Sequence, residues 1–178
     1  MKSSEPLMNG NEKQAEPDLV VSNAGPLISL STVSQLDLLR ALFGQIAIPQ
    51  AVYDEVVVHG EGEPGSREVG ESDWIKIHHV KDHLAVELLR ETLDAGESEA
   101  IVLAQELDAR YVILDDSLAR RKARLIKLRL VGTLGVLLMA KEAGLLPTVK
   151  PILDKLRQSE FRVSDRVYQN VLAKAGEA

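Results

Sequence analysis

Residues 111–120 read YVILDDSLAR. The first four are aromatic, β-branched or aliphatic, and they predict a short buried strand over residues 111–114. Two aspartates end that strand, and the basic, alanine-containing stretch after them predicts a helix over residues 118–128. A buried strand that ends in polar residues and leads into a helix is the repeating unit of a parallel sheet.

The same order of strand and helix recurs along the chain. Short apolar stretches predict further strands at residues 18–21, 46–48 and 129–131, and an edge strand or hairpin arm at 74–80. Apolar residues at helical spacing predict helices at residues 27–30, 33–42, 50–58, 83–92, 94–107, 134–143, 149–157 and 164–175. Residues 59–73, rich in glycine and charge, predict an exposed loop. This alternation predicts an α/β fold with three layers, α/β/α, around a short, mostly parallel central sheet.

Composition narrows the class of protein. Apolar residues make up 45% of the 178 residues and aromatic residues only 3%, so the core must be aliphatic. Cysteine is absent, which excludes disulfides and thiolate metal sites and suits a cytoplasmic protein. No apolar run approaches the roughly 18 to 20 residues of a membrane helix, so we expect no membrane association. We expect residues 1–17 to be a disordered tail and residues 18–178 to form one domain.

Polar residues stand where two of the predicted strands end. Asp115 and Asp116 follow one strand directly, and Ser22 and Asn23 follow another. Ligands of parallel sheets bind at the carboxyl ends of the strands, so these side chains are candidates for a binding site. The alternative is that the aspartates only cap the next helix and that Ser22 and Asn23 only form a turn.

Three glutamates are expected near the same edge. Glu55 lies on the helix predicted at residues 50–58, and Glu97 and Glu99 lie in the first turns of the helix at 94–107. Several carboxylates at one edge favour Mg²⁺ or Mn²⁺, and such an ion can activate water and stabilise a phosphate. Helical phase does not choose between Glu97 and Glu99, because they flank the core face on opposite sides. Glu97 could instead complement the helix N-terminus, and Glu55 could be an ordinary exposed residue.

A basic stretch follows the two aspartates. The net charge of −6 argues against a protein coated in nucleic acid but leaves room for a local basic patch. On a helix, Arg120, Arg124 and Lys127 share one face, which could meet RNA phosphates or an acidic partner. Arg120 is the best single candidate because it stands one turn from the aspartates. The alternative is the solvated face of an ordinary amphipathic helix.

Five stretches, in their order along the chain, resemble the PIN domain, and in particular a compact PIN-like branch found in bacteria and archaea. They are VVSNAGPLI (20–28), IPQAVYDEV (48–56), DAGESEAIVLA (94–104), VILDDSLAR (112–120) and VGTLGVLLMAK (131–141). The resemblance covers most of the chain from Leu19 to about Gly176. It implies a Mg²⁺- or Mn²⁺-dependent ribonuclease, with RNA as substrate and, as in many toxins of toxin–antitoxin pairs, an antitoxin as partner. It also implies a homodimer.

The resemblance carries over residue by residue. It implies catalytic, metal-binding roles for Glu55, Glu99 and Asp116, with Asp115 as a further metal ligand. Thr133 matches a small hydroxyl residue at the pocket rim, where Ser22, Asn23 and Glu97 are also expected.

The chain departs from the family pattern at the first strand. There the family usually ends with an aspartate, and this chain has Ser22 followed by Asn23, which removes one carboxylate. The first hypothesis is therefore a metal-dependent endoribonuclease, and the second is a PIN-like scaffold that binds RNA or a protein without cleaving RNA. A metabolic enzyme that uses a nucleotide is a weak third hypothesis, because the chain has no glycine-rich phosphate-binding loop.

Overall fold

The computed structural model describes residues 19–178, and the tail expected at residues 1–17 lies outside the described residues. A five-stranded sheet crosses the centre in the order β3-β2-β1-β4-β5, and every neighbouring pair is parallel. The strands are β1 (Val20–Ser22), β2 (Ile46–Pro49), β3 (Ile75–His78), β4 (Tyr111–Ile113) and β5 (Leu130–Val131). The predicted α/β/α fold is confirmed, with a sheet that is parallel throughout.

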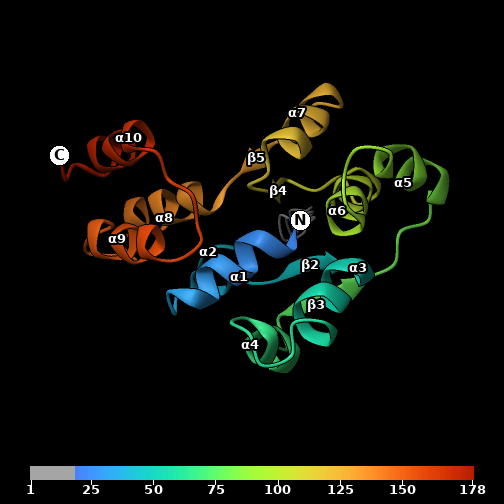
Figure 1. The fold of residues 1–178 in the computed structure, drawn as a ribbon, viewed down its shortest axis with the longest axis horizontal. Coiled ribbons are helices and arrows are strands. Elements are labelled where there is room, and N and C mark those ends of the chain that lie inside the picture. Colours follow the sequence, from blue (N-terminus) through green and yellow to red (C-terminus); the bar gives the residue numbers. More distant parts are fainter. Residues whose placement is uncertain (1–18) are drawn as a thin grey trace, which may run out of the picture.

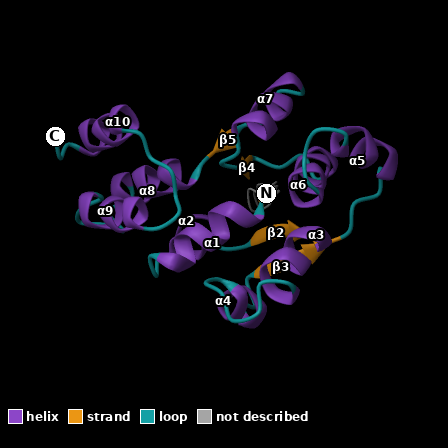
Figure 2. Ribbon diagram, in the orientation of Figure 1, coloured by secondary structure: helices purple, strands orange, loops and turns teal. Residues whose placement is uncertain are grey.

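Helices follow the strands and cover both faces of the sheet (Figure 2). They are α1 (Ala24–Thr32), α2 (Asp37–Phe43), α3 (Gln50–Tyr53), the π-helix η1 (Asp54–Val58), α4 (Ser66–Glu71), α5 (His83–Arg90), α6 (Ala95–Glu106), α7 (Ser117–Leu125), α8 (Thr133–Glu142), α9 (Lys150–Gln158) and α10 (Asp165–Ala175). Figure 1 shows α8, α9 and α10 gathered at one end of the molecule and α5 and α6 at the opposite end. Among residues 19–178, no helix is both long and apolar enough to cross a membrane.

The structure corrects the sequence-based prediction in three places. The supposed loop at residues 59–73 contains α4, which buries Val69 and Ser66 in spite of its glycines and charges. The helix predicted at residues 50–58 changes to π-helical hydrogen bonding at Asp54. The basic helix ends at Leu125, three residues earlier than predicted. Of the two alternatives at residues 74–80, the edge strand is confirmed, as β3 parallel to β2.

Alternation along the strands builds two separate cores. Val20, Ile46 and Ile113 point into one core, with α1, α2, α8, α9 and α10. Val21 and Val112 point into the other, with α5, α6 and α7. Because successive side chains of a strand point to opposite faces, both faces of the sheet are buried. The predicted aliphatic core is therefore divided into two layers by the sheet.

The register of the central strands brings several chain segments to one edge. Ser22 pairs with Ile113, and the backbone N–H of Asn23 donates to the carbonyl of Ile113 at 3.0 Å. The chain turns from strand to helix at this edge after β1, β2, β4 and β5. Polar residues of four chain segments therefore come together there.

The contribution of one core to stability can be measured at Leu137. This side chain on α8 is 0% exposed, so Leu137→Ala should lower the free energy of unfolding by about 2–5 kcal/mol through lost burial and a residual cavity. Leu125→Ala is the control, because Leu125 is 79% exposed and its change should stay within about 0.5 kcal/mol. Urea unfolding followed by circular dichroism gives both values. Equal losses in the two variants would contradict this description of the core.

Candidate functional site

Asp115 joins the end of β4 to the start of α8. Its Oδ1 accepts a hydrogen bond from the backbone N–H of Thr133 at 2.8 Å, and its Oδ2 accepts one from the Thr133 hydroxyl at 2.6 Å. Burial raises the pKa of the Asp115 carboxyl, and the bonds from Thr133 and the charge of Arg120 only partly offset this. A Cβ at Gly132 would lie 2.8 Å from Oδ1, so the contact requires glycine there. Asp115 and Thr133 thus meet as predicted, chiefly as partners of each other.

Asp116 caps α7. Its Oδ1 accepts hydrogen bonds from the backbone N–H groups of Leu118 and Ala119, both at 2.8 Å. This is the capping alternative considered for the two aspartates, and it uses one oxygen only. The side chain is exposed and lines a groove, and Oδ2 accepts no hydrogen bond from residues 19–178. The cap therefore leaves one carboxylate oxygen available.

Glu55 reaches the site from η1. A Cβ at Gly60 would collide with the carbonyl oxygen of Val56, so glycine is needed where this π-helical turn ends. π-Helical turns are often found at functional sites, because the extra residue redirects the side chains around it. Partial burial and the negative charge of Asp94 raise the pKa of Glu55, against a smaller opposite effect of His59. Glu55 is thus held beside other carboxylates.

Asn23, rather than Ser22, faces Glu55. A Cβ at Gly96 would lie 3.0 Å from Glu55 Oε2 and 3.2 Å from Asn23 Oδ1, so both oxygens lie above the same point of α6. Asn23 is 7% exposed, and its Oδ1 has no hydrogen-bond partner within the described part of the chain. Ser22 is 0% exposed, and its hydroxyl donates to the carbonyl of Asn23 at 3.0 Å. The neutral side chain that stands among the acidic residues is therefore Asn23.

The structure also separates the two glutamates of α6. The backbone N–H of Glu97 donates to Asp94 Oδ1 at 2.7 Å, and the backbone N–H of Asp94 donates to Glu97 Oε2 at 3.3 Å. Burial and the negative charges of Asp94, Asp116 and Glu55 raise the pKa of Glu97 to about 7. Glu97 thus caps the helix, as one alternative predicted, and also lies within the field of the other carboxylates.

The Glu99 carboxylate lies in a different environment from that of Glu97. Its Oε2 accepts a hydrogen bond from the backbone N–H of Ala51 at 3.0 Å, in the first turn of α3. The carboxylate therefore complements the N-terminus of another helix. Of the two candidates, the structure brings Glu97 to Glu55 and Asp116, and it places Glu99 against α3.

The oxygen donors around Glu55 suit a hard divalent cation with few protein ligands. Among residues 19–178, no three acidic, histidine or cysteine side chains are close enough together to hold one metal ion. Mg²⁺ commonly binds through one or two carboxylates and keeps several waters. A buried acceptor such as Asn23 Oδ1 is normally satisfied by a protein group, a water or an ion. The donor set of Asn23, Glu55, Glu97 and Asp116 therefore fits Mg²⁺ or Mn²⁺ in chemical type.

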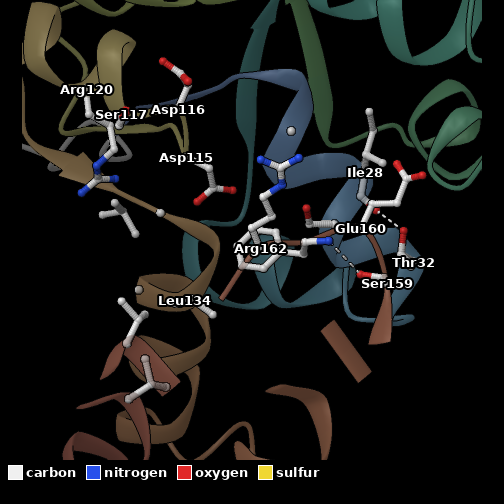
Figure 3. A pocket seen from close by; sticks show the side chains of 18 of the residues that line it. Ile28, Thr32, Asp115, Asp116, Ser117, Arg120, Leu134, Ser159, Glu160 and Arg162 are labelled. Carbon is white, nitrogen blue, oxygen red and sulfur yellow. Dashed lines mark hydrogen bonds between the residues drawn. The ribbon is translucent and has the colours of Figure 1, made fainter. Parts of the chain in front are cut away.

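The acidic edge forms one wall of a large groove. Its volume is about 1620 Å³, and Glu55 is among the residues that line it. Asp115 and Asp116 line it as well (Figure 3). The opposite wall consists of α8, α10 and the connection between α9 and α10. Pockets for small molecules span roughly 300–1,000 Å³, so this groove suits a larger ligand.

Only part of the predicted basic face exists. Arg120 lines the groove and donates from Nη1 to the carbonyl of Leu114 at 2.7 Å. Burial and the charge of Arg124 lower the pKa of Arg120, which still stays protonated near neutral pH. Arg120, Arg121 and Arg124 line a smaller adjoining pocket. Lys127 lies beyond the end of α7 with a φ of 62°, so the prediction that it shares a helical face with the arginines is wrong.

The opposite wall of the groove could not be predicted from the sequence. Arg162 and Lys174 line it, together with Glu160 and one face of α10. The spacing of Val167, Val171 and Lys174 along α10 predicts a common face. Nothing in the neighbouring sequence indicates that this face lines the same groove as the acidic edge.

The raised pKa of Glu97 makes the stability of the folded protein depend on pH. Its pKa of about 7 lies above the ordinary value of 4.5, so the folded state binds this proton more tightly than the unfolded chain. The contribution to stability is therefore complete below pH 4.5 and is lost as the pH rises through about 7. Carboxyl NMR should show this titration, and Asp116→Asn should lower the pKa by removing a negative neighbour. An unchanged pKa in that variant would contradict the proximity of the two groups.

Comparison with known families agrees with this geometry. A family model described as the PIN domain matches residues 19–177, which is almost the whole of the described chain. No curated protein matches the chain. The parallel sheet between two helical layers, with carboxylates at the edge where its strands end, is what the sequence resemblance implied. The chain belongs to the PIN-domain family.

Proposed function

We propose that the protein is a Mg²⁺- or Mn²⁺-dependent endoribonuclease that hydrolyses phosphodiester bonds at this acidic edge. The observation that carries the proposal is the buried Oδ1 of Asn23, which lacks a partner in the described chain and shares the space above Gly96 with the Glu55 carboxylate. PIN domains are generally nucleases, often in toxin–antitoxin systems. Family membership therefore supports RNA as the substrate and an antitoxin as a partner.

Each side chain of the site has a proposed role. Glu55 would contact the ion directly, with Asn23 Oδ1 as a neutral oxygen donor above the same point of α6. Glu97 and Asp116 would add negative charge around the ion and bind its water molecules. When bound, the ion would activate a water molecule and stabilise the negative charge that develops on the phosphate. Asp115 positions the edge through Thr133 and does not need to touch the ion.

Glu97 takes the third acidic position in this proposal. Sequence resemblance favoured Glu99, but the hydrogen bond from Ala51 turns the Glu99 carboxylate to the first turn of α3. Glu97 is the glutamate of α6 whose pKa is raised, after burial and the charge of Asp94, by the charges of Asp116 and Glu55. A bound cation would relieve that repulsion.

One observation favours a second function, which is RNA or protein binding without cleavage. The first strand ends with the neutral Ser22, followed by Asn23, where the resemblance calls for an aspartate. Among residues 19–178, no three carboxylates are close enough together for one ion. Fewer carboxylates compensate less positive charge and weaken cation binding. The protein would then bind RNA or a protein in the groove and would not cleave RNA.

The nuclease proposal predicts which carboxylates cleavage requires. Glu97→Gln and Asp116→Asn should each reduce Mn²⁺-dependent cleavage of single-stranded RNA by about 100-fold or more, the scale on which positioned acid–base groups act. Asparagine is as good a helix cap as aspartate, so the Asp116 variant should remain folded. Glu99→Gln should retain most of the activity. Cleavage of labelled RNA resolved on a gel gives the rates.

The exposed Glu91 supplies a charge-matched control in Glu91→Gln, which should cleave like the wild type. Equal cleavage by wild type and Asp116→Asn would assign the activity to a contaminant or to another site. A loss with Glu99→Gln but none with Glu97→Gln would restore the assignment made from the resemblance.

The alternative of an impaired site is tested at Asn23. Under that alternative, Asn23→Asp should raise Mn²⁺ affinity in calorimetry and produce cleavage, because it adds a carboxylate beside Glu55. Ser22→Asp is the comparison, and it should destabilise the fold because Ser22 is 0% exposed and a charge there would be buried. Cleavage by the wild type equal to that of Asn23→Asp would reject the impaired site.

A further inference from the structure

The groove has a second wall, built by the C-terminal part of the chain. Helix α10 contributes Val167, Asn170, Val171 and Lys174, which recur at helical spacing on one side of the helix. The connection between α9 and α10 contributes Arg162 and its two preceding residues. This wall comes from a different region of the chain than the acidic edge, and nothing in the proposed hydrolysis uses it.

The backbone before Arg162 is fixed by hydrogen bonds, whereas its guanidinium has no partner among residues 19–178. Figure 3 shows its guanidinium extending into the groove. The Ser159 hydroxyl donates to the carbonyl of Leu156 at 2.7 Å and accepts from the backbone N–H of Phe161 at 3.3 Å, which fixes the backbone before Arg162. Arg162 is exposed and makes no ion pair or hydrogen bond with residues 19–178. The nearby Arg157, by contrast, is paired with Asp165 at 2.7 Å.

Acidic and basic side chains both line the groove, with Arg120 beside the acidic edge and Glu160 on the same wall as Arg162. Five acidic and three basic side chains line it: Glu55, Glu63, Asp115, Asp116 and Glu160, and Arg120, Arg162 and Lys174. Arg120 already donates to a backbone carbonyl at 2.7 Å. Arg162 and Lys174 are therefore the cations of the lining that have no hydrogen bond within the described chain. A polyanion that reaches the acidic edge would be repelled there and needs positive charge on the opposite side.

The groove also offers contacts for bases. Leu134, Leu138 and Met139 of α8 line it on the same wall as α10. Apolar surface of this kind suits nucleobases whose faces are exposed, which is the condition of single-stranded RNA and not of a duplex.

We propose that Arg162 and Lys174 bind backbone phosphates of single-stranded RNA on the wall opposite the acidic edge. The inference rests on the proposed function for the choice of RNA as ligand. An arginine guanidinium forms strong, charge-assisted hydrogen bonds with phosphate oxygens, and lysine acts as a point charge. The two residues would hold the strand across the groove while Glu55 and Asp116 face the phosphate to be cleaved.

The test measures RNA binding, not cleavage. The full chain is titrated against a fluorescein-labelled single-stranded RNA of about twelve nucleotides in EDTA, so that the proposed hydrolysis does not run, and anisotropy is followed at several salt concentrations. Arg162→Ala should weaken binding about tenfold, which corresponds to about 1.4 kcal/mol. It should also reduce the slope of log affinity against log salt by about 0.7, the value for one phosphate contact on a single strand. Lys174→Ala should change the slope similarly, and Arg162→Lys should restore part of the affinity.

The chain offers matched controls for both charges. Arg166 is exposed on α10 and Lys155 is exposed on α9, and neither lines the groove. Arg166→Ala and Lys155→Ala remove the same charges close by, so they should leave the salt slope unchanged. Circular dichroism melts of all variants exclude an effect of unfolding.

Two results would overturn the proposal. One is the absence of RNA binding by the wild type. The other is an affinity and salt slope for Arg162→Ala equal to those of Arg166→Ala, which would leave a protein segment as the occupant of the groove. Failure of the proposed function is a separate result, because a protein that binds RNA through Arg162 and cleaves none would lose the nuclease assignment and keep this inference.

Discussion

The two hydrogen bonds between Asp115 and Thr133 hold the beginning of α8 against the end of β4. Much of the structure depends on this junction. Helix α8 packs against α10, so the position of its first residue sets the position of the C-terminal wall relative to the sheet. Because Asp115 is largely buried and both its oxygens are used, its loss would leave an unpaired backbone N–H and a loosely attached helix. We therefore infer that Asp115 sets the shape of the groove, whereas Asp116 beside it caps α7 with one oxygen and lines the groove.

Like charges are concentrated at one end of the sheet at a cost in stability. Burial, and then the negative charges of Asp94, Asp116 and Glu55, raise the pKa of Glu97 to about 7. Burial and the charge of Asp94 likewise raise the pKa of Glu55. The rest of the fold tolerates this because aliphatic side chains on both faces of the sheet supply the main stabilising contribution. Perturbed pKa values of this kind cluster at functional sites.

Most of the fold could be predicted from the sequence, and the details of the site could not. Strands β1, β2 and β4 follow from short aliphatic runs, because a strand buried on both faces carries apolar side chains on both. The edge strand β3 follows from the alternation of apolar and polar residues. The choice between Glu97 and Glu99 could not be made, because it depends on the Ala51 amide, 48 positions away along the chain. The choice between Ser22 and Asn23 depends on where β1 ends, because a shift of one residue exchanges the side chain that faces Glu55 with the one that points away from it. Lys127 was misplaced because local patterns did not indicate that α7 ends at Leu125.

The two walls of the groove come from opposite parts of the chain, and this fixes the order in which they are made. A ribosome completes β1, η1, α6 and β4 before it synthesises α10, since α10 begins only at Asp165. Throughout that interval the carboxylates can gather at their edge while the helix that carries Lys174 does not yet exist. The groove gains its second wall only when α10 packs against α8, so the groove is the last part of the structure to be completed. A nascent chain would therefore pass through synthesis with an open, incomplete groove beside the messenger that encodes it.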